Sequence, residues 1–158
     1  MAVRIPLVIV NGQIQQLQSG DTIADHGEII QMTNNNAAAI PIGSVVYSDA
    51  VDGVDLAQAD AEATSRVIGL VQEPTEIGIA GTGDIITGGV MVATTAEWDA
   101  VSDLTGGLDV DDLYYLDETT PGAFTATAPT STSEYVVPVG VALSTTDMLL
   151  VNHASVLL

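Results

Sequence analysis

The apolar residues of this chain fall in short runs rich in β-branched side chains, and this pattern constrains the fold more than any other feature of the sequence. Gly, Asp, Asn or Thr separates each run from the next. Short strands with turn residues between them are typical of sandwiches and barrels. We therefore predict an all-β fold, a small β-barrel or β-sandwich. The runs that build it are residues 42–47, 66–71, 77–79, 85–86, 90–93, 113–116, 135–143 and 148–151.

One short helix is expected within this β-rich pattern. Thr94 and Glu97 have the spacing of a capping box, in which each residue satisfies a free backbone N–H of the other at the helix start. Trp98 and Val101 then fall on one face, before a Thr-Gly-Gly sequence ends the segment. We predict that Trp98 covers the barrel as a lid. Residues 55–64 are rich in alanine but show no apolar stripe, so they fit either a loop or a short helix.

The N-terminal region predicts a β-hairpin. Asn11-Gly12 separates two apolar runs, and this dipeptide suits a tight turn because both of its residues must adopt positive φ. Pro6 has no backbone N–H to donate, which places the first strand at a sheet edge. A further short strand is expected at residues 29–32.

A change of amino-acid composition after this region predicts the domain organisation. Small and polar residues without periodicity follow the short strand and are typical of a linker. We predict an N-terminal β-hairpin arm at residues 1–32, a linker at 33–39 and a barrel or sandwich domain at 40–158.

The C-terminal domain contains a weak internal repeat. A tyrosine-bearing run ending at Tyr47 precedes a glycine-bearing run around Gly69, and a run containing Tyr115 precedes a second one around Gly140. Each copy then continues to another apolar run. Glycine inside a strand marks a sharp bend or a close backbone approach. The pattern fits either a duplicated unit or a chance similarity between β segments.

The charge balance excludes two classes of partner. The chain has 21 acidic residues against two basic ones, and its formal net charge is −19. Phosphate backbones and anionic lipids require clustered Lys or Arg. We therefore predict no nucleic-acid partner and no membrane partner. The simplest role of the acidic surface is solubility and resistance to self-association. Adaptation to a salt-rich environment and attraction of a cationic or divalent-metal partner are the alternatives.

No combination of residues points to catalysis. The chain has no cysteine, and its glycine-rich turns lack the lysine of a phosphate-binding loop. The acidic run at residues 109–112 lacks the glycine and glutamate of a calcium loop. His26 and His153 have no partners at metal-ligand spacing. We predict a non-enzymatic protein with no catalytic residue, no cofactor and no metal site.

Three stretches resemble virion proteins of tailed bacteriophages. Residues 8–23, a hairpin followed by Leu-Gln-Ser-Gly-Asp-Thr, are similar to the start of many phage tail-fibre and head-associated proteins. Residues 112–144 resemble a β module of phage virion proteins, with a tyrosine strand, a Pro-Gly turn and a Val-Gly-Val-Ala-Leu-Ser strand. Residues 43–89 look like the β-barrel of capsid decoration, or cement, proteins.

The resemblance implies a structural protein on the capsid exterior, which bridges subunits of the major capsid protein as a homotrimer. The alternative is a tail- or head-fibre protein that contacts the host surface, and we favour decoration because no long repetitive shaft follows the hairpin. The hairpin is then expected to add a strand to a neighbour's sheet edge, or else to complete the protein's own sheet. The candidate attachment or intersubunit contacts are Val3, Arg4, Ile5, Leu7, Ile9, Ile14 and Leu17.

Overall fold

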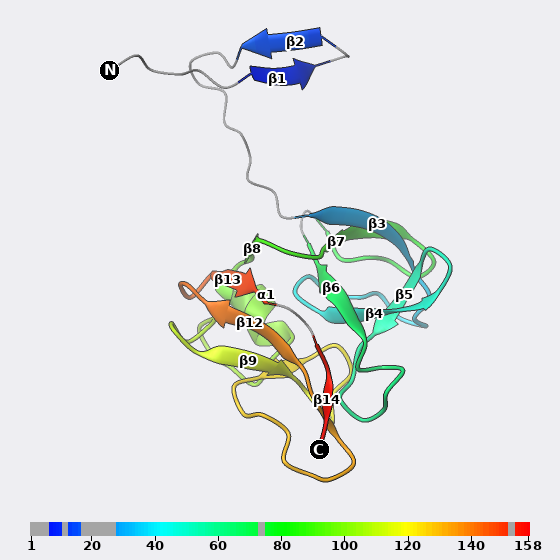
Figure 1. The fold of residues 1–158 in the computed structure, drawn as a ribbon, viewed down its shortest axis with the longest axis vertical. Coiled ribbons are helices and arrows are strands. Elements are labelled where there is room, and N and C mark those ends of the chain that lie inside the picture. The colour runs from blue at the N-terminus through cyan, green and yellow to red at the C-terminus, as the bar shows by residue number, and fades with distance from the viewer. Residues whose placement is uncertain (1–6, 11–12, 17–27, 73–74, 152–153) are drawn as a thin grey trace.

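Figure 1 shows the fold in a computed structural model, which describes residues 7–10, 13–16, 28–72, 75–151 and 154–158. Strands dominate these residues and the single helix among them is short, which confirms the all-β prediction. The elements are β1 (Leu7–Val10), β2 (Gln13–Gln16), β3 (Ile29–Asn34), β4 (Val45–Ala50), β5 (Gly53–Leu56), β6 (Val67–Val71), β7 (Thr82–Ile86), β8 (Val90–Val92), α1 (Thr95–Ala100), β9 (Leu113–Leu116), β10 (Phe124–Thr125), β11 (Tyr135–Val136), β12 (Pro138–Ala142), β13 (Asp147–Leu150) and β14 (Val156–Leu157).

The first half of the body is a closed barrel with the strand order β3-β5-β4-β6-β7. All neighbouring strands are antiparallel except β3 and β5, which run parallel. Thr33 and Asn34 at the end of β3 pair with Gly53 and Val54 of β5, and this pairing closes the barrel.

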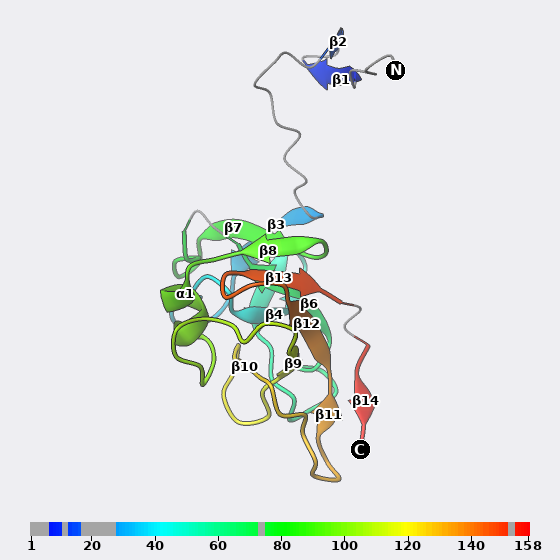
Figure 2. The same cartoon turned by 90° about the vertical axis from the view of Figure 1, so that its left-hand side faces the viewer.

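The second half is a five-stranded antiparallel sheet with the order β10-β9-β12-β13-β8. Helix α1 follows β8, and the chain then returns to the sheet at Ser102, which forms a parallel bridge with Phe124 of β10. Strands β11 and β14 pair as a separate ribbon. Figure 2 shows the sheet, the helix and this ribbon from the side.

The two halves share one topology, which supports the duplicated unit over a chance similarity. Strands β3, β7, β6, β4 and β5 are neighbours in that order, and so are their counterparts β8, β13, β12, β9 and β10. The registers also agree: Gly69 lies opposite Val46, and Gly140 lies opposite Tyr114, each beside a register shift. Other equivalent pairs are Ile29 and Val90, Ile85 and Met148, Ile86 and Leu149, Val54 and Phe124, and Asn34 and Ser102.

Gly43 and Asp111 occupy the same turn in the two repeats. Both adopt positive φ, 84° and 71°. Each donates its backbone N–H to the glycine-bearing strand, to the carbonyl of Val71 at 2.9 Å or of Ala142 at 3.0 Å. The acidic run at residues 109–112 therefore forms a structural turn. Its counterpart in the first repeat has the same conformation without any carboxylate.

Parts of three barrel strands, β4, β6 and β7, are buried on both faces. In β4, β6 and β7, successive residues belong to two different apolar clusters, one inside the barrel and one shared with the second sheet. A strand buried on both faces has no polar alternation, which explains the continuous apolar runs of the sequence. The alternating residues are Val46, Val71 and Ile85 inside the barrel and Val45, Leu70 and Ile86 on the other face.

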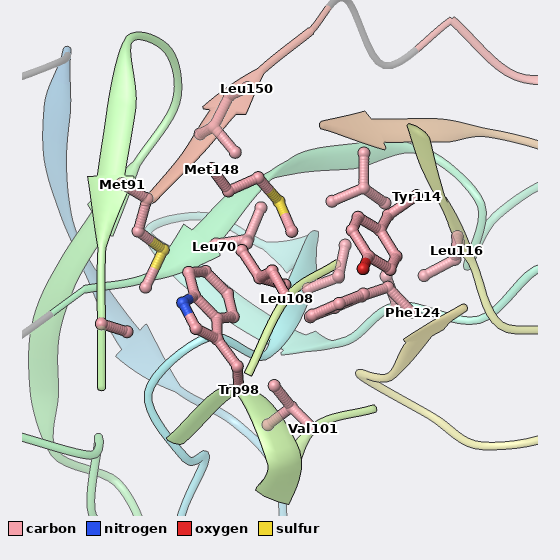
Figure 3. Close-up of a cluster of buried hydrophobic side chains, with 14 of the residues drawn as sticks. Leu70, Met91, Trp98, Val101, Leu108, Tyr114, Leu116, Phe124, Met148 and Leu150 are labelled. Carbon is pink, nitrogen blue, oxygen red and sulfur yellow. The ribbon is translucent and has the colours of Figure 1, made fainter. Parts of the chain in front are cut away.

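The larger cluster holds three aromatic side chains (Figure 3). The ring centroids of Trp98 and Phe124 are 5.7 Å apart and those of Tyr114 and Phe124 are 5.2 Å apart, both edge to face. Where the barrel has Val46 and Val54, the second repeat has Tyr114 and Phe124, so larger side chains fill a sheet that does not close. Trp98 is fully buried among them. It is part of the core, not the lid that the sequence predicts.

Helix α1 forms as the sequence predicts. The Thr94 hydroxyl accepts a hydrogen bond from the Glu97 N–H at 3.3 Å, and the Thr94 N–H donates to the Glu97 carboxylate at 2.7 Å. Residues 57–66 form turns and no helix, so the alanine-rich segment is a loop, one of the two alternatives that its sequence allows.

The predicted boundary between arm and body lies too far along the chain. Residues 29–32, assigned to the arm, form the start of β3 and pair with β7. Residues 33–34, assigned to the linker, close the barrel. Asn34 is buried, and its side-chain amide donates to the carbonyls of Ile77 at 2.8 Å and Ala38 at 2.9 Å. Asparagine is common in loops because its side chain bonds to nearby backbone groups. The asparagine run therefore looks like a linker in the sequence, although here the Asn34 side chain bonds to backbone groups inside the body.

Candidate functional site

The N-terminal hairpin is the first candidate surface. Strands β1 and β2 pair with Val10 opposite Gln13, which leaves two residues for the turn, as the Asn-Gly dipeptide predicts. Leu7, Ile9 and Ile14 of the candidate contacts lie in these strands, and Ile9 lies directly opposite Ile14. The other candidates lie outside the described residues: Val3, Arg4, Ile5 and Leu17.

The hairpin is separate from the sheets of the body. Among the described strands, β1 and β2 pair only with each other. Both views show them apart from the barrel and the second sheet (Figures 1 and 2). An isolated two-stranded hairpin is at best marginally stable in water. A further surface would add to the stability of these strands, which makes the hairpin a candidate contact.

Three exposed apolar side chains form a second candidate surface, which we call the β8 strip: Val90, Val92 and Leu149. Val90 and Val92 are 37% and 55% exposed, whereas Met91 between them is fully buried. Leu149 is 40% exposed and lies opposite Val90 in the register. Directly opposite residues on one face of a sheet are in side-chain contact, so the three residues form one continuous apolar strip.

From the sequence, residues 90–93 are predicted only as one more apolar run, and the strip is not predicted. A strand of three residues is too short for its sequence to show which side chains are buried and which are exposed. Knowledge of the partner strand is also needed, because Leu149 joins the strip only through its pairing with Val90.

The arm reaches the body close to the β8 strip. The carbonyl of Glu28, next to the start of β3, accepts hydrogen bonds from the N–H of Thr87 at 2.7 Å and from its hydroxyl at 2.8 Å. Thr87 is three residues before Val90, the first residue of β8. The point where the arm joins the body and the β8 strip therefore lie at the same end of the molecule, as Figure 2 shows.

A cavity of about 280 Å³ lies where loops of the two repeats meet. Pro41, Ser44 and Leu56 line one side, and residues 100–103 and 120–124 line much of the rest. The carboxylate of Asp117, which also lines it, already accepts hydrogen bonds from its own loop. The second carboxylate of the lining, that of Asp103, is exposed, and one such carboxylate does not define a ligand, so we assign the cavity none.

Asp117 organises the loop beside this cavity. Its Oδ1 accepts hydrogen bonds from the N–H of Thr119 at 2.6 Å, the Thr119 hydroxyl at 2.8 Å and the N–H of Thr120 at 2.8 Å. Partial burial disfavours the charged carboxylate, but these hydrogen bonds outweigh it and lower the pKa of Asp117. The carboxylate is thus a structural element of the loop.

Glu118 and Glu134 form a pair of carboxyl groups on the surface. The side-chain hydrogen bond between them raises the pKa of Glu118 and lowers the pKa of Glu134. The two groups therefore titrate together, and their pKa values move in opposite directions. Glu134 also accepts a hydrogen bond from the N–H of Ser131 at 3.0 Å.

Other features of the described ranges add no chemistry. Within them, no three His, Asp or Glu side chains lie close enough to hold a metal ion. In the same part of the chain, no helix has the length and apolar character needed to cross a membrane. The Arg66 guanidinium is paired with Glu62. His26 and His153 lie outside the described residues.

Comparison with known proteins gives no further guidance. No protein-family model matches the chain, and no curated protein matches its sequence.

Proposed function

We propose that this protein is a structural component of a tailed-phage virion, which decorates the outer capsid surface and bridges neighbouring subunits of the major capsid protein. One observation carries the proposal: the hairpin of β1 and β2 pairs with no other described strand, although its positions are largely apolar. Such a hairpin gains stability when it packs on a neighbour's sheet. The resemblance of the sequence to decoration proteins supports the same role.

The body suits repeated, modest contacts. Two repeats packed on a shared core make a rigid unit, and the cluster between them includes residues from both. Binding at many equivalent capsid sites adds up small contributions, so no single contact must be strong. The acidic body keeps copies soluble at high local concentration and is unsuited to binding the packaged genome.

The test is to count copies on purified particles and then remove the arm. A decoration protein should be present in hundreds of copies, whereas a few copies would indicate the alternative, a fibre or adsorption protein. Deleting residues 1–27 leaves Glu28 and all of β3 in place. We expect the truncated protein to keep its circular dichroism spectrum and its Trp98 fluorescence but to lose trimerisation or binding to particles that lack the native protein.

Two outcomes contradict the proposal. Binding of the truncated protein with unchanged stoichiometry would show that the arm is not the anchor. Absence of the full-length protein from purified particles would exclude a virion role altogether. A charge control keeps the arm but replaces Val51, a 92% exposed residue outside it, with aspartate. That variant should bind as the wild type does.

A further inference from the structure

We propose that the free edge of β8, with its apolar strip, receives the β1–β2 hairpin of a second copy of this chain. The inference rests on the proposed role of the hairpin as an intersubunit contact and names the surface that accepts it. The partner is a second copy of this protein, and the contact is the addition of a strand to an open sheet edge.

The first step is the open edge itself. Strand β8 lies at the end of its sheet and pairs with β13 alone among the described strands. Natural proteins protect such edges with charged residues, proline, a bulge or a covering segment. Strand β8 instead presents two exposed valines, and Leu149 beside them extends the apolar surface. Apart from its short length, β8 therefore has none of these protections against pairing with another strand.

Comparison of the two repeats shows where β8 stops. Its residues Val90–Val92 are equivalent to Ile29–Gln31 of β3, and both segments pair on one side only, with β13 or β7. In the barrel, β3 then continues to Thr33 and Asn34, which pair with β5. Strand β8 instead ends at Val92, the chain turns into helix α1, and only Ser102 restores the parallel contact with Phe124. The second repeat therefore lacks the strand extension that closes the first.

The hairpin fits this edge by charge. All 21 acidic residues lie at or after Asp21, and residues 1–20 carry a single charged side chain, that of Arg4. The β8 strip is bordered by a carboxylate, because Asp147 lies opposite Val92. The hairpin segment is thus not repelled by an anionic body as a second body would be, and its Arg4 is attracted to that body.

The hairpin also fits by its reach. The chain from Gln16 to Ile29 can span at most about 45 Å when fully extended. The arm joins the body beside Thr87, at the same end as β8. When copies approach through these ends, each arm starts next to a neighbour's β8, so each copy can give one hairpin and receive one in a closed ring of copies. In both views the hairpin lies away from β8 of its own chain (Figures 1 and 2).

Disulfide trapping tests the proposal directly, because the chain has no cysteine of its own. One variant carries Val8→Cys or Ile9→Cys, which represent the two alternating faces of β1. The second, which carries an affinity tag, has Val92→Cys. The two chains are coexpressed, oxidised mildly and separated by size without reducing agent. The matched control replaces Val92→Cys with Val51→Cys, whose parent residue is more exposed, 92% against 55%.

We expect a disulfide between the two different chains for at least one arm variant. Docking raises the effective concentration of the thiols, so trapping should exceed that of the Val51→Cys control by about tenfold or more. Equal trapping at both positions, or none at Val92→Cys for either arm variant, overturns the proposal. A chain with both Val92→Cys and an arm cysteine that forms only an internal disulfide also overturns it, because the hairpin would then cover its own chain. The experiment uses no particles, so its failure is distinct from failure of the capsid-binding test.

Discussion

Gly69 and Gly140 occupy the same place in the two repeats. A methyl group on Gly69 would lie 2.2 Å from the carbonyl oxygen of Ile86, and one on Gly140 would lie 2.8 Å from that of Leu149. Ile86 and Leu149 are themselves equivalent, since they pair with Ile29 and Val90. In each repeat, the glycine thus allows its strand to approach the backbone of the next strand. This confirms the close backbone approach expected from glycine within a strand.

Alanine at either position should therefore destabilise the protein. We expect Gly69→Ala and Gly140→Ala each to cost about 1–3 kcal/mol, the usual range for overpacking a dense core. Gly69→Ala should cost more, because the nearest atom is a rigid backbone oxygen, whereas Gly140 first meets the flexible Met148 side chain at 2.5 Å. Urea unfolding followed by circular dichroism gives both values. Gly88→Ala is the matched control, since nothing lies within 4 Å of its added methyl group. If all three variants are equally stable, the two strand glycines are not packing constraints.

Trp98 should be the most costly single truncation in the second repeat. Its ring is fully buried, and its Nε1–H donates to the carbonyl of Thr146 at 2.9 Å. Trp98→Ala should lose about 3–5 kcal/mol, while Trp98→Phe keeps most of the volume and should lose less. Calorimetric melting temperatures measure the order. If Trp98→Ala has the same melting temperature as the wild type, the Trp98 ring does not contribute to the stability of the core.

The Asp117 carboxylate should make stability depend on acid pH. Its folded pKa lies below the ordinary value of 3.8. Its contribution is therefore fully present above that value and is lost as pH falls through the folded pKa. Asp117→Ala removes the acceptor of three hydrogen bonds and should cost about 1–2 kcal/mol at pH 7. The difference from wild type should shrink towards pH 2. If the difference in unfolding free energy between Asp117→Ala and the wild type stays constant over this range, the effect comes from packing and not from the charge of the carboxylate.

Much of the fold could be predicted from the sequence, because its signals are local. The Asn-Gly turn, the Thr94–Glu97 capping box and the short β-branched runs each depend on neighbouring residues. The boundary at Asn34 could not, because a buried asparagine that closes a barrel has the same sequence signature as a polar linker. The β8 strip depends on the pairing of Val90 with Leu149, which are far apart in the sequence.

The oligomeric state should depend on the β8 strip. We expect the full-length protein to sediment as an oligomer, with a trimer as the size that its resemblance to decoration proteins implies. Val92→Asp places a charge in the strip, beside Asp147, and should shift the protein towards monomer at tens of micromolar by analytical ultracentrifugation. Val51→Asp adds the same charge elsewhere and should not. If wild type is already monomeric, neither the oligomer nor the arm exchange stands.

The carboxyl pair of Glu118 and Glu134 should make the protein more stable in mild acid than at neutral pH. The folded pKa of Glu118 is raised above its ordinary value of 4.5 by the hydrogen bond with Glu134. Its contribution is fully present below that value and is lost as pH rises through the folded pKa. The pKa of Glu134 is lowered, so its contribution is lost only as pH falls through the lower value. The contact is thus strongest between the two folded pKa values, when one proton is shared.

Replacing Glu118 with glutamine tests this pair, because the amide is a permanent donor to the Glu134 carboxylate. Glu118→Gln should raise the melting temperature at pH 7, where the wild-type carboxylates are both charged and repel. Its advantage should disappear as pH falls below the raised pKa of Glu118, where the wild type regains its own donor. Glu76→Gln removes an equal charge from an exposed residue outside the pair and controls for the relief of overall repulsion in a chain of net charge −19. If Glu118→Gln changes the melting temperature by the same amount as Glu76→Gln at every pH, the interaction between Glu118 and Glu134 does not contribute to stability.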